Sequence, residues 1–307
     1  MEINPASLVR SLRGVAQAAK LSEAQIEPNV RHLSSSAESR TLTSWQRFFE
    51  NRTSGAGGNS LNHAILRLSL AVSFLRETAR QDHPASPKDL ARCWDMIYQA
   101  ITRSDSPAFT AARSAQGFLS VALCSLVKDG SIDELFRLHV WLPDGRRGNP
   151  DFKLHSHQPF AQSWILAGEG EDHTWEVAPV GNPAEATHAG YVLAWDDGKG
   201  QDGAYKTHQS SSTVRNTGSL FKATETQSEI HRRGSTYTVP AAAFHTSEVA
   251  PDALHATLFF FDSHRGFVKD AGVLGPKDGD AFTQLWDPAG ISPRVLAEAV
   301  EAARLRE

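Results

Sequence analysis

The order of apolar and polar positions divides the chain into a helical N-terminal part and a strand-rich remainder. Between residues 60 and 81, apolar side chains recur every three or four positions, which is typical of a helix with one buried stripe. The same spacing around Leu8, Leu12 and Val15 predicts a short helix near the N-terminus. Residues 43–52 carry three aromatic side chains at helical spacing, so we expect another helix there.

Two serine–proline pairs mark expected helix starts. Ser86 and Ser292 each precede a proline; serine can cap the first turn, and proline suits the first helical position. The apolar positions between about 107 and 128 predict a further helix. We therefore expect a helical region over residues 1–130 and a C-terminal helix over residues 291–307.

Beyond the predicted helices the pattern changes to strict alternation. In residues 135–142, Leu135, Arg137, His139 and Trp141 fall on one face of a predicted strand, and the positions between them are all apolar. The Arg137 face either lines a binding site or meets solvent, and the pattern alone favours neither. Further strands are predicted at 151–157, 173–178, 236–239 and 256–261.

Composition narrows the class of protein. The chain has 307 residues, 40% apolar and 21% charged, and a net charge of −4, which is ordinary for a globular protein and argues against a dedicated nucleic-acid binder. No apolar run is long enough to span a membrane, and the N-terminus lacks the apolar core of a secretion signal. Cys93 and Cys124 both fall in predicted helices. We expect them to be reduced and buried, in a cytoplasmic protein without membrane contact.

A glycine-rich segment, NRTSGAGGNS at residues 51–60, precedes a predicted helix. Such loops can place backbone amides around a phosphate group. This one lacks the Lys-Ser/Thr ending of nucleotide-binding loops, and no strand clearly precedes it. The pattern therefore favours a linker.

The candidate chemistry lies in residues 153–168, KLHSHQPFAQSWILAG. His155 and His157 are two positions apart, so on a strand both imidazoles would point to the same side. A third histidine, His245, follows Pro240 by five residues. Three neutral imidazoles on neighbouring strands can bind one divalent transition metal. A bare His-x-His arises easily by chance in a chain with 13 histidines, so its surroundings carry the hypothesis.

These surroundings resemble the two motifs of the cupin superfamily, whose first motif supplies two histidines and usually a glutamate, and whose second supplies another histidine. Here Gln162 stands at the glutamate position, and Ala242 replaces the usual glycine two residues after Pro240. The resemblance covers about residues 135–265. It implies an α+β fold in which the helical N-terminal region is followed by a single cupin-type double-stranded β-helix barrel at 131–290 and the C-terminal helix.

The all-histidine ligand set is similar to that of the thiol and diketone-cleaving dioxygenases, and loosely to the cysteine dioxygenase group. The resemblance implies a non-haem Fe(II) dioxygenase that uses O2 and no organic cofactor, acting on a small organic acid, thiol or diketone. Two departures argue against free cysteine as the substrate. That group often has a cysteine at the glutamate position, where this chain has Gln162. The tyrosine that supports its iron would fall near Phe261, which has no hydroxyl group. Imidazole ligands also suit nickel, manganese, copper and zinc.

Without a glutamate ligand, a site made by His155, His157 and His245 keeps both positive charges of the ion. Such a site favours an anionic, chelating substrate. We expect Gln162 to take a catalytic role, either as a weak ligand through its amide oxygen or as a hydrogen-bond donor to the substrate or a bound oxygen species. If Gln162 points toward the metal, Trp164 shares its inward side.

The expected substrate-binding residues are basic or aromatic. Arg137 or Arg265 could pair with a carboxylate, because a guanidinium group binds carboxylates through two hydrogen bonds. Large aromatic side chains would favour an organic acid that is larger or more apolar than cysteine. The full expected set is Arg137, His139, Trp164, Phe259, Phe261 and Arg265.

Two other classes of function stay open. One is a non-redox metalloenzyme, an isomerase, lyase or hydrolase that uses the ion as a Lewis acid. The other is a ligand-binding sensor, which ranks last because no basic helix-turn-helix is recognisable. Residues 181–235 exceed what a compact barrel needs and are expected to cover a rim or form a partner surface. The N-terminal helices could pack on the barrel, cover its pocket or form a homodimer.

Overall fold

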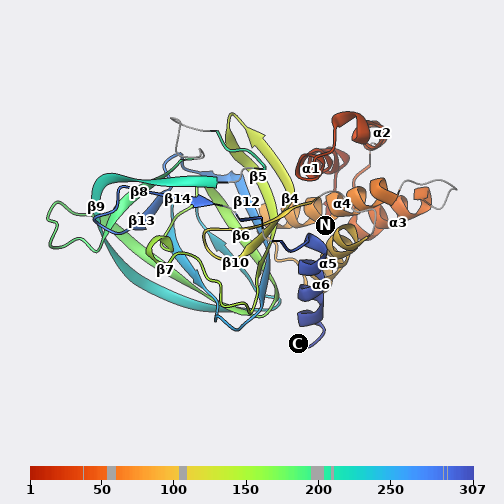
Figure 1. Ribbon diagram of the computed structural model, residues 1–307. Coiled ribbons are helices and arrows are strands. Elements are labelled where there is room, and N and C mark those ends of the chain that lie inside the picture. The colour runs from red at the N-terminus through yellow and green to blue at the C-terminus, as the bar shows by residue number, and fades with distance from the viewer. Residues whose placement is uncertain are drawn as a thin grey trace.

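Helices gather at one end of the molecule and antiparallel sheets at the other (Figure 1). The computed structural model describes residues 1–36, 38–53, 60–103, 109–194, 204–208, 211–285, 287–288 and 290–307. The expected linker glycines at 55–58 and the predicted helix start near Pro107 lie outside these ranges. So do residues 196–203, whose polar, glycine-rich sequence predicts a turn. None of the described helices combines the length and apolar character needed to cross a membrane.

The helices begin where the sequence places their caps. Ser86 Oγ accepts a hydrogen bond from the backbone N–H of Asp89 at 3.1 Å, and Ser292 Oγ accepts one from Val295 at 3.3 Å. Each following proline occupies the first turn. Both predicted starts are therefore confirmed. The helices are α1 (Pro5–Ala18), α2 (Glu23–Ser34), α3 (Leu42–Thr53), α4 (Ser60–Arg80), α5 (Pro87–Thr102) and α6 (Pro293–Arg304), with a 3-10 turn η1 (Pro150–Phe152).

Two large antiparallel sheets form the rest of the molecule. In spatial order, the first consists of β10 (Thr236–Val239), β6 (Pro159–Ala167), β12 (His255–Phe267), β5 (Ser131–Trp141), β4 (Leu119–Lys128), β3 (Ala111–Arg113) and β15 (Asp287–Pro288). The second consists of β11 (Phe244–Glu248), β7 (Glu169–Pro179), β9 (Ser211–Arg232), β8 (His188–Ala194) and β13 (Gly272–Gly275), with β14 (Ala281–Leu285) paired to β9. A short pair, β1 (Glu2–Ile3) and β2 (Arg40–Thr41), lies beside the helices.

The helix predicted to reach Lys128 is wrong, because this segment forms β4. Leu119, Val121 and Leu123 are fully buried, and the register of β4 against β5 shifts between Ala122 and Cys124. This bulge adds one residue to the strand, so the apolar positions no longer alternate strictly and also fit a helical period. Cys124 therefore lies in a strand, although both cysteines are free and buried as expected.

The first sheet has two different faces. One packs on the helices, with Phe136 stacked on Phe260 at 4.1 Å inside a core that includes side chains of α1, α4, α5 and α6. At Gly14 of α1, an added Cβ would lie 2.4 Å from Cys124 Sγ, so the helix approaches β4 too closely for a larger residue. The opposite face of the same strands, including Arg137 and His139, looks into the interior between the sheets.

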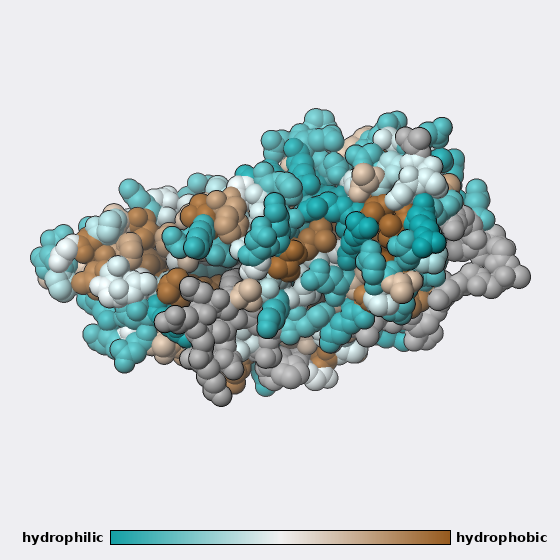
Figure 2. All heavy atoms as spheres, turned by 90° about the horizontal axis from the view of Figure 1, so that it is seen from above, coloured by the Kyte–Doolittle hydropathy of each residue, from teal (hydrophilic) through white to brown (hydrophobic). Residues whose placement is uncertain are grey.

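The described residues of the segment 181–235 belong to the second sheet and do not form an insertion over a rim, whereas the expected partner surface stays a prediction. β9 runs for 22 residues and pairs with β7, β8 and β14, so it is the centre of this sheet. Seen from above, apolar side chains gather over the end of the molecule formed by this sheet (Figure 2). Its exposed large apolar residues are Val192, Ile230, Phe282 and Leu285.

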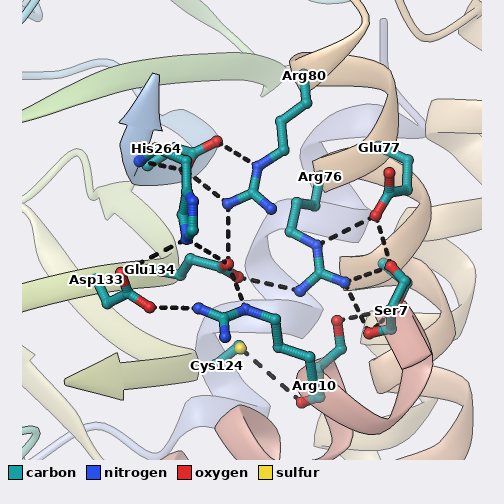
Figure 3. A network of polar contacts seen from close by, with 12 residues as sticks. Ser7, Arg10, Arg76, Glu77, Arg80, Cys124, Asp133, Glu134 and His264 are labelled. Carbon is teal, nitrogen blue, oxygen red and sulfur yellow. Dashed lines mark hydrogen bonds and ion pairs between the residues drawn. The ribbon is translucent and has the colours of Figure 1, made fainter. Parts of the chain in front are cut away.

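Ion pairs join the helical layer to the first sheet (Figure 3). The fully buried carboxylate of Glu134 on β5 accepts hydrogen bonds from Arg10 at 2.7 Å, Arg76 at 3.0 Å and Arg80 at 2.9 Å. Arg80 also binds Asp262 of β12 through two hydrogen bonds of 2.7 Å. Burial alone would raise the pKa of Glu134, but the three guanidinium charges outweigh it and lower that pKa to about 2.

Candidate metal centre

The histidine pair lies in an extended segment between η1 and β6, and not in the regular strand expected at 151–157. His155 exchanges two backbone hydrogen bonds with His245 of β11, at 2.9 and 3.2 Å. On its other side, the same segment bonds to β13, through the N–H of Ser156 to the carbonyl of Gly272 at 2.8 Å. The segment therefore fills the space between β11 and β13, the two outer strands of the second sheet.

The three expected ligands come together. The Nε2 atoms of His155 and His157 are 3.1 Å apart, and those of His245 and His157 are 3.4 Å apart. Metal–nitrogen bonds of about 2.0–2.1 Å would separate neighbouring ligand atoms by about 3.0 Å in an octahedron and about 3.4 Å in a tetrahedron. The spacing of these nitrogens is therefore that of ligands around one transition-metal ion.

The outer nitrogens are oriented by hydrogen bonds. Nδ1 of His155 lies 2.8 Å from the carbonyl oxygen of Lys153, and Nδ1 of His245 lies 3.2 Å from the carboxylate of Asp172. Both acceptors require a proton on Nδ1, which leaves the lone pair on Nε2. Asp172 is itself held by Ser247, whose hydroxyl donates to it at 2.6 Å.

The charges around the site suit a cation. Burial, together with the neighbouring His245, lowers the pKa of His155 to about 4. Burial, followed by the nearby His245, also holds the pKa of His157 well below its usual value. Burial would raise the pKa of Asp172, but the hydrogen bond and charge interaction with His245 outweigh it and lower that pKa. The lowered pKa values favour neutral rings at His155 and His157 and an ionised carboxylate at Asp172, which fit a divalent metal without prior loss of protons.

Two connected cavities meet at these histidines. The inner one, of about 100 Å³, has His155, His157 and His245 in its wall. The outer one, of about 210 Å³, includes only His155 and His157. Arg137 lines both, as do Gln116 and Phe261. The metal ligands and Arg137 therefore lie at the junction of the two cavities.

Four of the six expected substrate-binding residues lie in these walls. His139 and Phe259 line the inner cavity, and Arg137 and Phe261 line both. The Arg137 guanidinium donates a hydrogen bond to the hydroxyl of Tyr205 at 3.2 Å. The Arg137 face of β5 therefore lines interior cavities and is not an outward, solvated surface.

Gln162, Trp164 and Arg265 lie on the opposite side of the first sheet, and not in either cavity wall. The Arg265 guanidinium donates to Gln162 Oε1 at 2.6 Å and to Asp82 at 2.7 Å. Trp164 is fully buried in the core that packs on the helices. The expectation that Gln162 and Trp164 face the interior is therefore wrong by one residue, and Ser163 lines the inner cavity instead. β6 begins only at Pro159, so the chain between His157 and Gln162 is not one continuous strand with regular alternation.

Several residues of the site are missing from the sequence interpretation. The sequence of residues 168–172, GEGED, predicts a turn, but Asp172 lies within β7, where it pairs in register with Ser247 of β11. Tyr237 lines the inner cavity from β10. In the predicted strand 236–239 it lies on the same face as the apolar Val239, and this alternation is the sequence signal for its inward position. Phe118 comes from the segment predicted as helix. These residues meet only through pairing between distant strands.

A second group of potential ligands, Asp133, Glu134 and His264, also brings three ligand atoms within 4.8 Å of one another. Its surroundings differ from those of the three histidines. Arg10 binds both Asp133 and Glu134, and Arg76 and Arg80 bind Glu134 (Figure 3). The negative charge of this group is therefore already balanced by guanidinium groups, and the group does not fit a cation.

The sequence matches no protein-family model and no curated protein. Among solved structures, the chain is similar to a hydroxypropylphosphonic acid epoxidase from S. wedmorenis, with 11% identity and a TM-score of 0.27 over 71% of this chain and 96% of that one. A protein of unknown function with a cupin-like fold from Ralstonia eutropha has 11% identity and a TM-score of 0.26, over 65% and 82%. A pumpkin pro-11S globulin has 12% identity and a TM-score of 0.26, over 51% and 32%, so the chain spans about a third of that protein.

Proposed function

We propose that this protein is a metal-dependent enzyme in which His155, His157 and His245 hold the ion. The observation that carries the proposal is the convergence of the three Nε2 atoms, with neighbours 3.1 and 3.4 Å apart. Two of the rings have their Nδ1 atoms turned outward to fixed acceptors, so their free lone pairs face one another. A shared cation removes the repulsion between these lone pairs.

The cavities favour an anionic substrate. Among the described residues that line them, Arg113 and Arg137 are the charged side chains other than histidine, and none is aspartate or glutamate. Arg113 is paired with Asp144 at the outer cavity, and Arg137, which lines both cavities, donates a hydrogen bond to the hydroxyl of Tyr205. The charge of a bound metal would therefore add to that of Arg137, and a carboxylate at the junction would balance both.

We further propose that the metal is iron(II) and that the reaction is a dioxygenation of a small organic acid, thiol or diketone. Bound iron(II) would supply electron transfer between the substrate and O2. In a dioxygenation both oxygen atoms enter the organic product, so no organic cofactor is required. The protein's own contribution is to orient the acid group with Arg137, to exclude water with Phe259 and Phe261, and to keep His245 aligned through Asp172.

The test combines metal analysis with oxygen uptake. The full chain, purified without an affinity tag, is analysed for metals beside His155→Ala and the control His188→Ala, which removes a histidine from the second sheet away from the three ligands. We expect about one iron per chain in the wild type and the control, and at least a tenfold loss in His155→Ala. Oxygen consumption is then measured with candidate thiols, diketones and aromatic acids.

Each result has a defined meaning. Iron together with substrate-dependent oxygen uptake supports the dioxygenase. Zinc without uptake overturns the redox proposal in favour of Lewis-acid chemistry at the same site. Equal metal content in all three proteins, or none in any, overturns the metal centre itself.

A further inference from the structure

The inner cavity is walled mainly by rings. Phe118, Trp141, Tyr237, Phe259 and Phe261 all contribute to it, and it lies directly behind the three metal ligands. Its volume of about 100 Å³ is of the same order as the roughly 150 Å³ cavity that holds a benzene molecule in an engineered protein. A flat apolar group of the size of one ring therefore matches this space in shape and polarity.

One polar ring in this wall has no hydrogen-bond partner. His139 is only 5% exposed and is stacked between Phe118, at 4.0 Å, and Phe259, at 4.7 Å. Within the described part of the chain, neither of its nitrogens makes a hydrogen bond. Nε2 is covered on all sides, so Nδ1 is the ring nitrogen that a molecule in the inner cavity can reach. Polar groups in protein interiors are nearly always paired, so this nitrogen calls for a polar atom that the protein itself does not supply.

The charge of the side chains that line the cavities also argues against a substrate with an ammonium group. An amino acid would bring an ammonium group close to the metal and Arg137. The described lining residues offer no carboxylate to pair with that ammonium group. Burying it there would cost the hydration of a charge and add repulsion between like charges.

We propose that the substrate is an aromatic carboxylic acid without an amino group, whose ring fills the inner cavity and whose ring hydroxyl or carbonyl group hydrogen-bonds to His139. The acid group lies at the junction with Arg137. This inference deepens the proposed function and depends on it for the position of the acid group beside the metal. His139 acts here as a substrate-binding residue that selects the polar group on the ring.

The test is calorimetric binding of three probes to the full chain, with the metal content of each sample measured. The probes are 3-(4-hydroxyphenyl)propanoate, tyrosine, which adds only the amino group, and 3-phenylpropanoate, which lacks only the hydroxyl. We expect the hydroxyphenyl acid to bind at least tenfold more tightly than tyrosine and about fivefold or more above phenylpropanoate. In His139→Phe the preference over phenylpropanoate should disappear, because the hydrogen-bonding ring is lost. The preference over tyrosine should remain, because the phenyl ring keeps the stack between Phe118 and Phe259.

His188→Phe serves as the matched control and should keep both preferences. Tyrosine binding as tightly as the hydroxyphenyl acid, or an unchanged hydroxyl preference in His139→Phe, would overturn the inference. Failure of the two proposals is distinguishable in the same samples. A metal-loaded protein that prefers tyrosine contradicts only the substrate class, whereas a protein without metal that still shows both preferences contradicts only the metal centre.

Discussion

At the scale of single residues, the orientation of two of the three ligands, His155 and His245, depends on a group that does not itself bind the ion. His155 is held by a backbone carbonyl, and no side-chain substitution removes that acceptor. His245 is held by the carboxylate of Asp172, which is open to substitution. Such outer hydrogen bonds fix the tautomer and raise the basicity of the ligand nitrogen.

Replacing Asp172 by asparagine should therefore weaken metal binding by about 10–100-fold while leaving the three histidines in place. The dissociation constant can be measured by competition with a chromophoric chelator. Glu171→Gln removes a neighbouring carboxylate from the opposite side of β7 and should leave the affinity unchanged. Equal affinities in the two variants would show that Asp172 does not orient His245.

The backbone at Ala242, in the turn before β11, departs from what its side chain favours. Ala242 has a φ of +63°. This is the left-handed region, which glycine adopts without strain and alanine does not. The turn that leads into His245 therefore carries backbone strain that a glycine would relieve.

At the scale of elements, features encoded locally could be predicted from the sequence, and features set by distant pairing could not. The caps at Ser86 and Ser292 are confirmed because a cap depends on three or four adjacent residues. The strand 236–239 is confirmed to the residue as β10. β4 was missed because its bulge imitates a helical period, and the parity of β6 was wrong because the step at Pro159 is decided by pairing with β12.

Gln162 and Ser163 are adjacent on β6 but face opposite sides of the first sheet, so their substitutions should have different effects. Gln162→Ala should leave the metal content unchanged, since this side chain bonds to Arg265 on the far side of the sheet. Ser163→Phe should reduce binding of small aromatic acids at least tenfold, because the added ring would occupy the inner cavity. Metal analysis and calorimetry on both variants measure the two effects. A loss of metal in Gln162→Ala would restore the expected catalytic role of Gln162.

At the scale of the whole molecule, the buried carboxylate of Glu134 binds three arginines of the helical layer to the first sheet. Removing its charge in Glu134→Gln leaves the guanidinium groups of Arg76 and Arg80 without their shared partner. We expect a loss of about 3–5 kcal/mol in the free energy of unfolding, as is usual when a buried ion pair is broken. Urea unfolding measures it. Glu298→Gln, which breaks an ion pair between exposed side chains, should leave the free energy of unfolding nearly unchanged.

Acid should destabilise the molecule well before its carboxylates titrate. Burial lowers the pKa of His255 from 6.5 to about 4, so between these values the unfolded chain binds a proton that the folded chain does not. Stability is therefore full above about pH 6.5 and falls as the pH decreases toward 4, by on the order of 3 kcal/mol for this group. Urea unfolding at a series of pH values should give a shallower decrease for His255→Gln than for the wild type. Parallel curves would contradict this assignment.

The segment around His155 lies between the two outer strands of the second sheet and also carries two of the ligands. A cation bound to His155 and His245 would tie together, through their side chains, two stretches whose backbones already exchange hydrogen bonds. Once the metal is removed, only a few backbone hydrogen bonds would hold the His155 segment to β11 and β13. Hydrogen–deuterium exchange in the metal-free protein should therefore accelerate first at the amides of His155, Ser156 and His245, because the second sheet would open there.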